Sequence, residues 1–483
     1  MAVALNLKSA PGTALHRKIY QEWREGILSG RFRRGERVPS TRDLAATLGI
    51  ARSTVTTAYE QLTAEGYFES ARGSGTFVCR ELPETLLHAR RPATASRAAE
   101  SPVAAEPIRL SRYASELSDP RLLQPPVPAG WLRLSHWRPD LDHFPWAIWH
   151  RLMKRHLGSS ATHLFDYADS PAGHEPLRRE ITAYLARSRA VNCSPDQVVV
   201  VNGSQQGLDL CTRILIDRGD EVALENPGYQ GARQIFQAFG ARLTAAAMDS
   251  DGVIPASLSP KARLVYVTPS HQFPTGVSMS VARRLELIEW ARRHGAVIIE
   301  DDYDSEYRYS GAPLPAMQGL AKGVPVFYIG TFSKVMFPGM RIGYVIVPPA
   351  LAGVFQRVKW LADRQTPLLE QAALADFLRE GHLERHTRKM RRVYGRRREV
   401  MVASVSKYFG SKAQVLGDEA GMHALVRFED DGVAARAVAN RVQLASSEGY
   451  YQGEAPKNEF VFGFSCVTES QLREAIRRLA THT

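Results

Sequence analysis

Three patterns of apolar and polar residues follow one another along the chain. In residues 13–80, apolar residues recur at helical spacing and glycines interrupt them. Residues 81–128 show little periodicity and contain frequent prolines, which is typical of an extended, semi-stiff linker. From residue 129 onward, short apolar runs alternate with amphipathic stretches. We therefore expect a small N-terminal domain at 13–80, a linker at 81–128 and a larger domain at 129–483.

The larger domain is predicted to be built on a β-sheet. Its runs are apolar on both faces, and the stretches between them are long enough for helices. This pattern favours a mainly parallel sheet covered by helices, an α/β fold. The clearest runs are 198–201, 221–224, 263–268, 296–301 and 326–331. Over about 350–483 the pattern becomes helical and closes with shorter strands, which predicts a smaller α+β subdomain.

The small domain is predicted to begin with two helices. An apolar stripe marks the inner face of the first helix, which ends at Gly30; its members are Leu15, Ile19, Trp23, Ile27 and Leu28. Ser40 is a candidate N-cap of the second helix, because Asp43 follows three residues later as an acidic first-turn residue. Gly49 is expected to end this helix.

A third helix and a hairpin complete the predicted small domain. The inner face of the helix holds Val55, Leu62 and either Ala58 or Tyr59. The outer face at its start carries groups that can reach phosphates and base edges: Arg52, Ser53, Thr54, Thr56 and Thr57. The hairpin that follows has a flexible cationic tip at Arg72 and Gly73. This order predicts a DNA-binding winged helix-turn-helix, and the alternative is a small helical cap on the larger domain.

Composition narrows the class of protein. The 483 residues exceed what one compact core supports, and 44% apolar with 23% charged residues is ordinary globular usage. The chain has no apolar run of membrane-spanning length, no signal-peptide pattern at its start and four scattered cysteines without a C-x-x-C pair. We therefore expect a cytoplasmic protein without a membrane anchor, a disulfide framework or a metal site. The formal net charge of +12 favours anionic partners, and residues 1–80 hold twelve Lys or Arg against seven acidic residues.

Lys334 is a candidate for covalent chemistry, because it lies just past the apolar run 326–331. Ligands bind at the carboxyl ends of parallel strands, and desolvation there lowers the pKa of an ammonium group. Arg341 could clamp a phosphate group, with the hydroxyls of Thr331 and Ser333 nearby. A lysine taken alone is far more often a surface residue, so the assignment depends on its neighbours.

Two further groups of residues support a cofactor site. Ser204 and Gln205 follow Gly203 at a strand-to-helix junction, where free backbone amides can bind an anion; a tight turn that requires glycine is an equal alternative. Asp301 ends another apolar run and could keep a pyridinium nitrogen protonated, while Tyr303 could donate a hydrogen bond to a ring oxygen.

One aromatic residue is a candidate to face a flat cofactor ring. Tyr229 follows an Asn-Pro-Gly turn and could stack on such a ring, or it could be an ordinary core residue beside that turn. An acidic cluster such as 300–304 could instead bind a metal, but no His or Cys stands next to it in the sequence.

Residues 28–78 closely resemble the GntR-type winged helix, and the later motifs (GSQQ, NPGY, EDDYDSEY and GTFSK…GMRIGY) occur in the order of fold-type I aminotransferases. Together they resemble the MocR group of transcription regulators over the whole chain except the linker. The resemblance implies pyridoxal 5′-phosphate as the cofactor, operator DNA as a partner and a homodimer, head-to-tail. It implies DNA contacts from Arg42, Arg52, Ser53, Thr54, Thr56, Thr57, Arg72 and Gly73.

The same resemblance implies a role for each cofactor-site residue. It implies that Lys334 forms the covalent bond to the cofactor and that Tyr303 contacts the ring oxygen. It implies that Asp301, with Asp302 as the second choice, contacts the ring nitrogen. Tyr229 then stacks on the ring. The residues implied to bind the phosphate are Ser204, Gln205, Ser333 and Arg341, with Thr331 close by.

Two departures from the aminotransferase pattern affect the expected function. Phe273 stands where aminotransferases usually carry an asparagine that helps to hold the ring, although His271 could reach in from the side. The final strand, 458–465, lacks the arginine that usually binds a substrate carboxylate, and Arg233 is a weak candidate to replace it. An unpaired carboxylate in a dry site is costly, so efficient transamination of amino acids is doubtful.

These observations favour a transcription regulator that senses pyridoxal phosphate, as its effector or as the handle for an amine. Formation of the covalent bond is expected to shift the two subdomains and so to alter DNA binding. The missing arginine favours a vitamin-B6-responsive regulator over one that responds to amino acids. The alternatives are a working aminotransferase with a DNA-binding appendage and a cofactor-free dimerisation scaffold.

Overall fold

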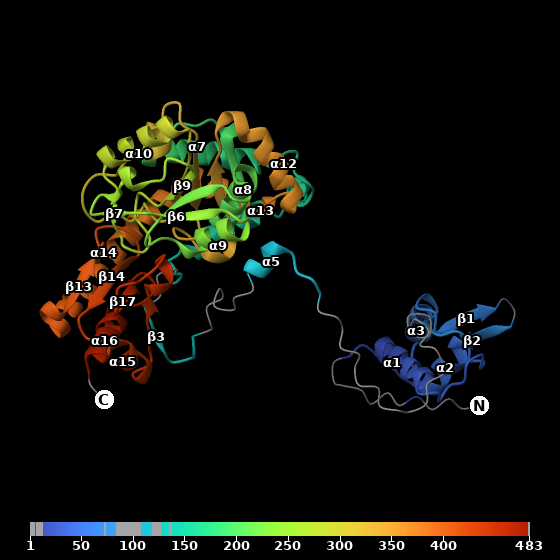
Figure 1. Ribbon diagram of the computed structural model, residues 1–483. Coiled ribbons are helices and arrows are strands. Elements are labelled where there is room, and N and C mark those ends of the chain that lie inside the picture. The colour runs from blue at the N-terminus through green and yellow to red at the C-terminus, as the bar shows by residue number, and fades with distance from the viewer. Residues whose placement is uncertain are drawn as a thin grey trace. The chain divides into compact units, whose positions relative to one another are not determined.

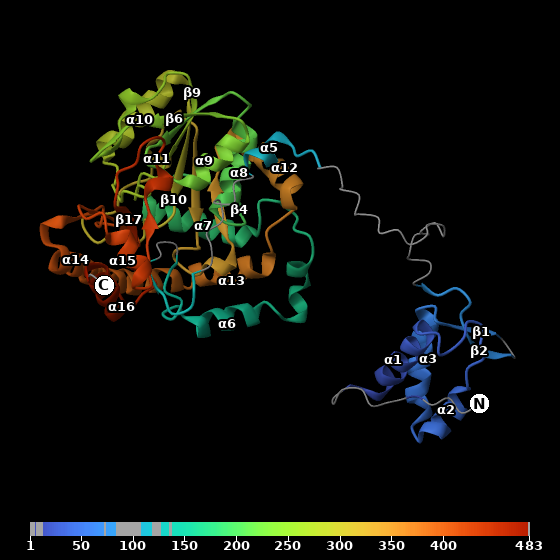
Figure 2. The same cartoon turned by 60° about the horizontal axis from the view of Figure 1, so that its bottom comes forward.

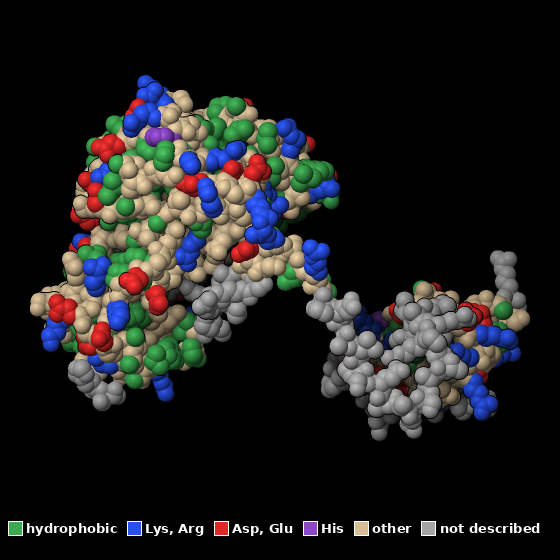
Figure 3. Space-filling view, viewed as in Figure 1, with side chains coloured by type: hydrophobic (Ala, Val, Ile, Leu, Met, Phe, Trp, Pro, Cys, Tyr) green, Lys and Arg blue, Asp and Glu red, His purple; other side chains and the backbone are tan. Residues whose placement is uncertain are grey.

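The computed structural model describes residue 5 and residues 13–71, 74–83, 108–117, 127–134 and 138–481. The chain divides into two compact units, Met1–Pro107 and Ile108–Thr483 (Figure 1). Within the described residues, no helix is both long and apolar enough to cross a membrane. On the face drawn in Figure 3, cationic and acidic side chains alternate over the larger unit instead of separating into patches of one sign.

The N-terminal unit has three helices and a hairpin, as the sequence predicts. They are α1 (Leu15–Leu28), α2 (Thr41–Leu48), α3 (Arg52–Ala64), β1 (Phe68–Ala71) and β2 (Gly75–Val78), with the two strands antiparallel. The Ser40 side chain accepts a hydrogen bond from the Asp43 backbone amide and so caps α2. Gly49 ends α2 in the left-handed conformation, with a φ of 66°.

Trp23 lies at the centre of the N-terminal unit. It is 1% exposed, and its ring contacts those of Phe32, Tyr59 and Phe68. The predicted stripe on α1 is correct for Ile19, Trp23 and Ile27, which are buried, but wrong for Leu15 and Leu28, which are exposed. These two residues are the ends of α1, where the neighbouring helices no longer cover its inner face.

The larger unit is built on a seven-stranded mixed sheet in the order β4-β12-β11-β10-β9-β5-β6. Every neighbouring pair is parallel except the two that involve β12, so the predicted mainly parallel sheet is confirmed. In sheet order, the strands are Val198–Val201, Gly343–Ile346, Val326–Thr331, Val297–Asp302, Ala262–Val267, Glu221–Glu225 and Arg242–Ala246.

Helices cover both faces of this sheet, which makes a three-layer structure (Figure 2). The helices α8 (Ser204–Leu215), α9 (Gln230–Ala238) and α12 (Ala352–Asp363) pack on one face. The other face is covered by α7 (Glu175–Arg189), α10 (Val281–His294) and α11 (Met317–Leu320), and beside α7 lie α6 (Trp146–Arg155) and α13 (Leu368–Arg379).

A second, antiparallel sheet forms the C-terminal part of the larger unit. Its order is β13 (Ala413–Leu416), β14 (His423–Phe428), β17 (Glu459–Gly463) and β16 (Ala445–Ser446). The helices α14 (His382–Phe409), α15 (Val433–Ala439) and α16 (Glu469–Ala480) accompany it. The short strand β3 (Leu132–Arg133) pairs with β15 (Val442–Gln443), so the chain before α6 returns to this region.

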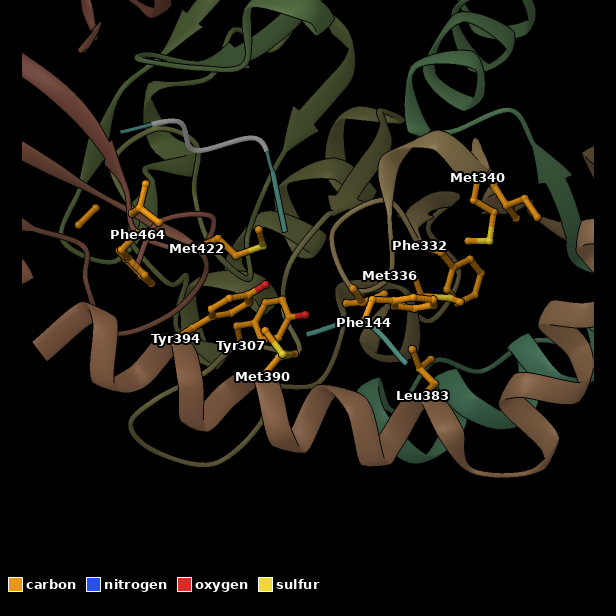
Figure 4. Close-up of a cluster of buried hydrophobic side chains, with 14 of the residues drawn as sticks. Phe144, Tyr307, Phe332, Met336, Met340, Leu383, Met390, Tyr394, Met422 and Phe464 are labelled. Carbon is orange, nitrogen blue, oxygen red and sulfur yellow. The ribbon is translucent and has the colours of Figure 1, made fainter. Parts of the chain in front are cut away.

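The long helix α14 links the two sheets through one apolar cluster. Figure 4 shows Leu383, Met390 and Tyr394 of α14 directed toward Phe144 and Tyr307. Inward residues of the large sheet and of the small sheet belong to the same cluster. The two sheets therefore share a core, and a change in the position of one sheet can alter the packing of the other.

Candidate functional site

One cavity of about 410 Å³ gathers every residue that the sequence assigns to the cofactor. It opens where β10 and β11 end and where α8 begins, as expected for a ligand site at the carboxyl edge of an α/β sheet. The predicted residues in its wall are Ser204, Gln205, Tyr229, Asp301, Tyr303, Thr331, Ser333, Lys334 and Arg341. Its remaining residues, which the sequence did not assign, are Arg138, Tyr266, Thr268, Phe273 and Pro338.

Asp301 and Asp302 point to opposite faces of β10, because side chains alternate along a strand. The Oδ2 atom of Asp301 accepts a 2.7 Å hydrogen bond from the Tyr266 hydroxyl, and its buried Oδ1 atom has no partner. Burial raises the pKa of Asp301 to about 7. Asp302 lies outside the cavity wall and accepts hydrogen bonds from Arg189 (2.8 Å) and Tyr328 (2.6 Å). Burial pushes its pKa up, but these partners hold it below the usual value.

Lys334 lies three residues past the end of β11, in the wall of the cavity. Burial lowers the pKa of its ammonium group to about 8, although Asp304 and Asp301 act in the opposite direction. About a tenth of an amine with this pKa is neutral near pH 7, far more than at its ordinary pKa of 10.5, and only the neutral form is a nucleophile. The burial of Lys334 therefore prepares its Nζ atom for attack on a carbonyl group.

The part of the site at the start of α8 (Ser204–Leu215) suits an anion. Gly203, with a φ of 86°, turns the chain from β4 into α8, so the backbone amides of Ser204 and Gln205 lie in the first turn of that helix. Arg341 donates a 3.0 Å hydrogen bond to the Asn202 carbonyl, which holds its guanidinium beside this turn. A Cβ atom on Gly203 would lie 2.7 Å from an Arg341 nitrogen, so the close approach requires glycine.

Two aromatic side chains, Tyr229 and Phe273, form an apolar part of the cavity wall. The Tyr229 ring meets the Phe273 ring edge-on, with 6.0 Å between their centroids. The Tyr229 hydroxyl donates a 2.9 Å hydrogen bond to the side-chain oxygen of Gln205. Burial raises the pKa of Tyr229 to about 12, so this hydroxyl stays protonated and keeps its role as a donor.

Tyr303 is held by a buried cluster that the sequence could not reveal. Its hydroxyl donates to the His271 carbonyl at 2.8 Å and lies 3.1 Å from the His271 Nδ1 atom, which is also 3.1 Å from Asp304. The ligand atoms of His271, Asp304 and His423 lie within 4.8 Å of one another. No histidine stands next to the acidic cluster in the sequence, but folding brings His271 and His423 beside Asp304. We interpret the cluster as a support for Tyr303, since His271 Nδ1 is already engaged by two oxygen-bearing groups.

Arg233 does not lie in the wall of the cavity. Its guanidinium donates to the carbonyls of Tyr451 (2.8 Å) and Gly449 (2.6 Å), so it fastens the turn before β17 to α9. The structure instead brings Arg138 into the wall, from a segment without periodicity that gave no signal in the sequence. Tyr266 could have been noticed, because its hydroxyl is an exception within the apolar run 263–268.

The predicted DNA-binding residues of the N-terminal unit lie on one surface around the start of α3. Arg42, Arg52, Ser53 and Thr57 are exposed, while Thr54 and Thr56 are partly exposed. The Arg52 Nε atom donates a 3.3 Å hydrogen bond to the Thr41 hydroxyl, so the first turns of α2 and α3 lie together. The remaining predicted contacts, Arg72 and Gly73, lie outside the described residues.

Known protein families match both units of the chain. The model of "Bacterial regulatory proteins, gntR family" matches residues 15–78, and that of "Aminotransferase class I and II" matches residues 146–479. The probable rhizopine catabolism regulatory protein MocR of Rhizobium meliloti is 38% identical over 96% of this chain and 93% of its own length. The pyridoxine biosynthesis regulator PdxR of Corynebacterium glutamicum is 30% identical over 97% of this chain and 96% of its own length.

The larger unit also resembles solved aminotransferases. The α-aminoadipate aminotransferase LysN of Thermus thermophilus, complexed with N-(5′-phosphopyridoxyl)-L-leucine, superposes with a TM-score of 0.70 and 26% identity. The match covers 77% of this chain and 96% of that one. The prediction of a winged helix joined to an aminotransferase fold is confirmed. The chain belongs to the MocR-type transcription regulators, in which a DNA-binding domain of the gntR family is joined to an aminotransferase class I and II domain.

Proposed function

We propose that this regulator senses pyridoxal 5′-phosphate in the cavity of its larger unit. The observation that carries the proposal is the unpaired, buried Oδ1 atom of Asp301 in the same cavity as Lys334. A buried oxygen without a partner is costly, and a protonated pyridine nitrogen would satisfy it. The anion site at the start of α8 supplies a place for a phosphate group. These features together fit the cofactor that the aminotransferase fold implies.

Each residue then has a definite task. Lys334 would bond covalently to the cofactor aldehyde, and Asp301 would hold the proton on the ring nitrogen. Tyr303 would donate to the ring oxygen once its hydroxyl proton turns away from the His271 carbonyl. Tyr229 covers a face of the ring. The phosphate would be bound by Ser204, Gln205, Thr331, Ser333 and Arg341, which all line the cavity. When bound, the cofactor supplies an electron sink, and this chain's residues supply its position and its protonation state.

Occupancy of the cavity can alter the junction between the two sheets of the larger unit. The Gly228 amide donates a 3.0 Å hydrogen bond to the Tyr450 carbonyl, and Asn226 and Gln452 hydrogen-bond to each other twice. These contacts join the segment that carries Tyr229 to the turn before β17. A ligand that binds more tightly to one arrangement of this junction shifts the population toward it, which is what coupling to DNA binding requires.

The active form is proposed to be a homodimer, head-to-tail, and one apolar surface supports this. Large apolar side chains of two neighbouring segments are exposed: Leu157 (56%), Phe165 (58%), Tyr167 (79%), Trp360 (44%) and Leu361 (77%). Gln365 joins the segments by hydrogen bonds to the Asp166 carbonyl (3.1 Å) and the Ala168 amide (2.5 Å). Exposed apolar groups gathered in one place mark an interaction surface, and a second copy of the chain fits the paired half-sites of an operator.

The test combines absorbance with DNA binding. Purified protein titrated with pyridoxal phosphate should turn yellow, and borohydride reduction should fix the adduct on Lys334, as mass spectrometry of peptides would show. The affinity for upstream DNA should change on the same titration. Lys334→Ala should lose both the adduct and the ligand-dependent change, while a matched substitution of an exposed lysine of the same unit, Lys261→Ala, should keep both.

The alternatives predict different results in the same experiments. A cofactor-free scaffold would stay colourless and carry no adduct. A working aminotransferase would convert an amino acid and a keto acid stoichiometrically, whatever happens at the DNA. An adduct on a different lysine, or an adduct without any change in DNA affinity, would contradict the sensing proposal.

A further inference from the structure

The wall of the cavity contains a second arginine besides Arg341, and it comes from an unexpected place. Arg138 precedes α6 by several residues and lies in the same cavity as Lys334 and Asp301. No described residue gives its guanidinium a hydrogen bond or an ion pair, and the residue as a whole is exposed. A cation held in a ligand cavity without a protein partner is available to a ligand of opposite charge.

The backbone of Arg138 is fixed to the end of the final strand. Its carbonyl accepts a 2.7 Å hydrogen bond from the Ser465 hydroxyl, two residues past β17. Arg397 donates both to the Ser465 carbonyl and, at 2.6 Å, to Asp140, so the chain on the other side of Arg138 is tied to the same point. The Asp140 amide also donates a 2.9 Å hydrogen bond to the Tyr394 hydroxyl.

This attachment has two consequences. It places Arg138 at the end of β17, in the region where the sequence lacks the arginine that usually binds a substrate carboxylate. It also engages Asp140, the carboxylate nearest to Arg138 along the chain, because Asp140 is paired with Arg397 and is not available to neutralise Arg138. Burial pushes the pKa of Asp140 up, but Arg397 and His143 hold it below its ordinary value, so this pairing persists at neutral pH.

Arg138 and Arg341 belong to different walls of the site. Arg341 binds the Asn202 carbonyl before α8, beside the large sheet, whereas the Arg138 backbone is bound to the small sheet. A ligand with one anionic group at each end would satisfy both arginines. The phosphate of the cofactor accounts for the group at Arg341, which leaves Arg138 for a second anionic group.

We infer that Arg138 is a specificity-determining residue that binds the carboxylate of an amine ligand joined to the cofactor, so the effector class is amino acids and not simple amines. This inference rests on the proposed function, because it requires the cofactor in the cavity. The sequence favoured a regulator that responds to the vitamin alone because the final strand lacks an arginine for a substrate carboxylate. Arg138 can take the place of that arginine, so this reason no longer holds. Because the backbone of Arg138 is fixed in advance, binding has to order only its side chain, which favours affinity.

The test uses two stable probes that differ in one carboxylate. They are N-(5′-phosphopyridoxyl)-L-leucine and the phosphopyridoxyl adduct of 3-methylbutylamine, the amine formed when leucine loses its carboxylate. Each is titrated by calorimetry into cofactor-free full-length protein. The variants are Arg138→Ala, Arg138→Lys and the control Arg179→Ala, which removes an exposed arginine of α7 that pairs with Glu175.

We expect the wild type and Arg179→Ala to bind the leucine adduct about 5- to 30-fold more tightly than the amine adduct, as for one charged contact that is partly open to solvent. Arg138→Ala should bind both probes equally, and Arg138→Lys should keep part of the preference. A preference that survives in Arg138→Ala, or that is absent from the wild type, would overturn the inference.

Failure of the proposed function would look different. A separate portion of each preparation is treated with pyridoxal phosphate and borohydride, and an adduct on Lys334 shows that the variant is folded and can bind the cofactor. If the wild type carries no adduct and binds neither probe, the cofactor proposal itself is wrong. If the adduct forms but the carboxylate makes no difference, only the role of Arg138 is refuted.

Discussion

The ionisation of Asp301 gives a prediction whose magnitude follows from the structure. Burial raises the pKa of this carboxyl group from 3.8 to about 7. At about 1.4 kcal/mol for each pKa unit, ionised Asp301 costs the cofactor-free protein about 4 kcal/mol. Because the folded-state pKa is the higher one, this cost is absent below about pH 4, grows as the pH rises and is complete above about pH 7. Asp301→Asn removes the ionisation and should remove this pH dependence.

The assay is urea unfolding of the larger unit in cofactor-free, full-length protein at about pH 5 and pH 8. About 1.7 kcal/mol of the cost is already present at pH 5, so the stability of Asp301→Asn relative to the wild type should rise by about 2.6 kcal/mol between the two conditions. Glu306, whose pKa burial also raises to about 7, is present in both proteins and cancels in the comparison. The pKa of Glu225, which burial also raises to about 7, is raised in part by the charge of Asp301, so Asp301→Asn lowers it and adds to the effect in the same direction. The assay compares the change in stability between the two pH values and not the stability at one pH. The reason is that the new amide of Asp301→Asn leaves its own unpaired polar group, at a cost that does not depend on pH.

The same substitution should act in the opposite direction on cofactor binding. A neutral amide cannot pair with a protonated ring nitrogen, so Asp301→Asn should bind pyridoxal phosphate more weakly while being more stable without it at pH 8. This combination is the usual sign of a site that is strained until its ligand arrives. A stability difference that stays constant between pH 5 and pH 8 would refute the reasoning, because it would mean that Asp301 does not ionise in a buried environment.

Four other substitutions test the remaining parts of the account. Trp23→Ala should destabilise the N-terminal unit by about 3–5 kcal/mol, because the residue is 1% exposed in an aromatic cluster; DNA binding should be lost while the Lys334 adduct still forms, and retained DNA binding would contradict this. Arg52→Ala should weaken operator binding by about 1–3 kcal/mol in a gel-shift titration without changing cofactor affinity. Gly203→Ala should cost about 1–3 kcal/mol in thermal unfolding because of its φ of 86°, and it should weaken cofactor binding by displacing the Arg341 guanidinium. Leu361→Asp, at a side chain that is 77% exposed, should leave the fold intact but convert the dimer to a monomer in light scattering, and an unchanged mass would argue against this surface.

Local patterns predicted the elements of both units well. Ser40 and Gly49 bound α2 as expected, since an N-cap and a left-handed glycine act through neighbouring backbone groups. The apolar runs became strands because buried parallel strands must be apolar on both faces. The errors at Leu15 and Leu28 concern the extent of burial at the ends of α1, which depends on neighbours far away in the sequence.

The candidate site was predictable only where a motif carries its residues. Lys334, Asp301 and Arg341 were singled out because each follows an apolar run with its own short motif, and the structure brings them to one cavity. His271 and Asp304 are 33 positions apart, so their contact could not be read from either motif. Arg138 belongs to no motif and no periodic stretch, so the sequence gave no reason to assign it to the site.

The sequence by itself therefore determined the kinds of domain, the order of their elements and the residues whose neighbours along the chain reveal them. Tertiary structure alone decided which face of β10 looks into the cavity and which arginine lines it. Asp301 faces the cavity while Asp302 is paired with Arg189, and Arg138 reaches the site through Ser465, 327 residues away. The physical reason is that burial and charge pairing depend on distances between atoms in space, and folding sets those distances between segments that the chain keeps far apart.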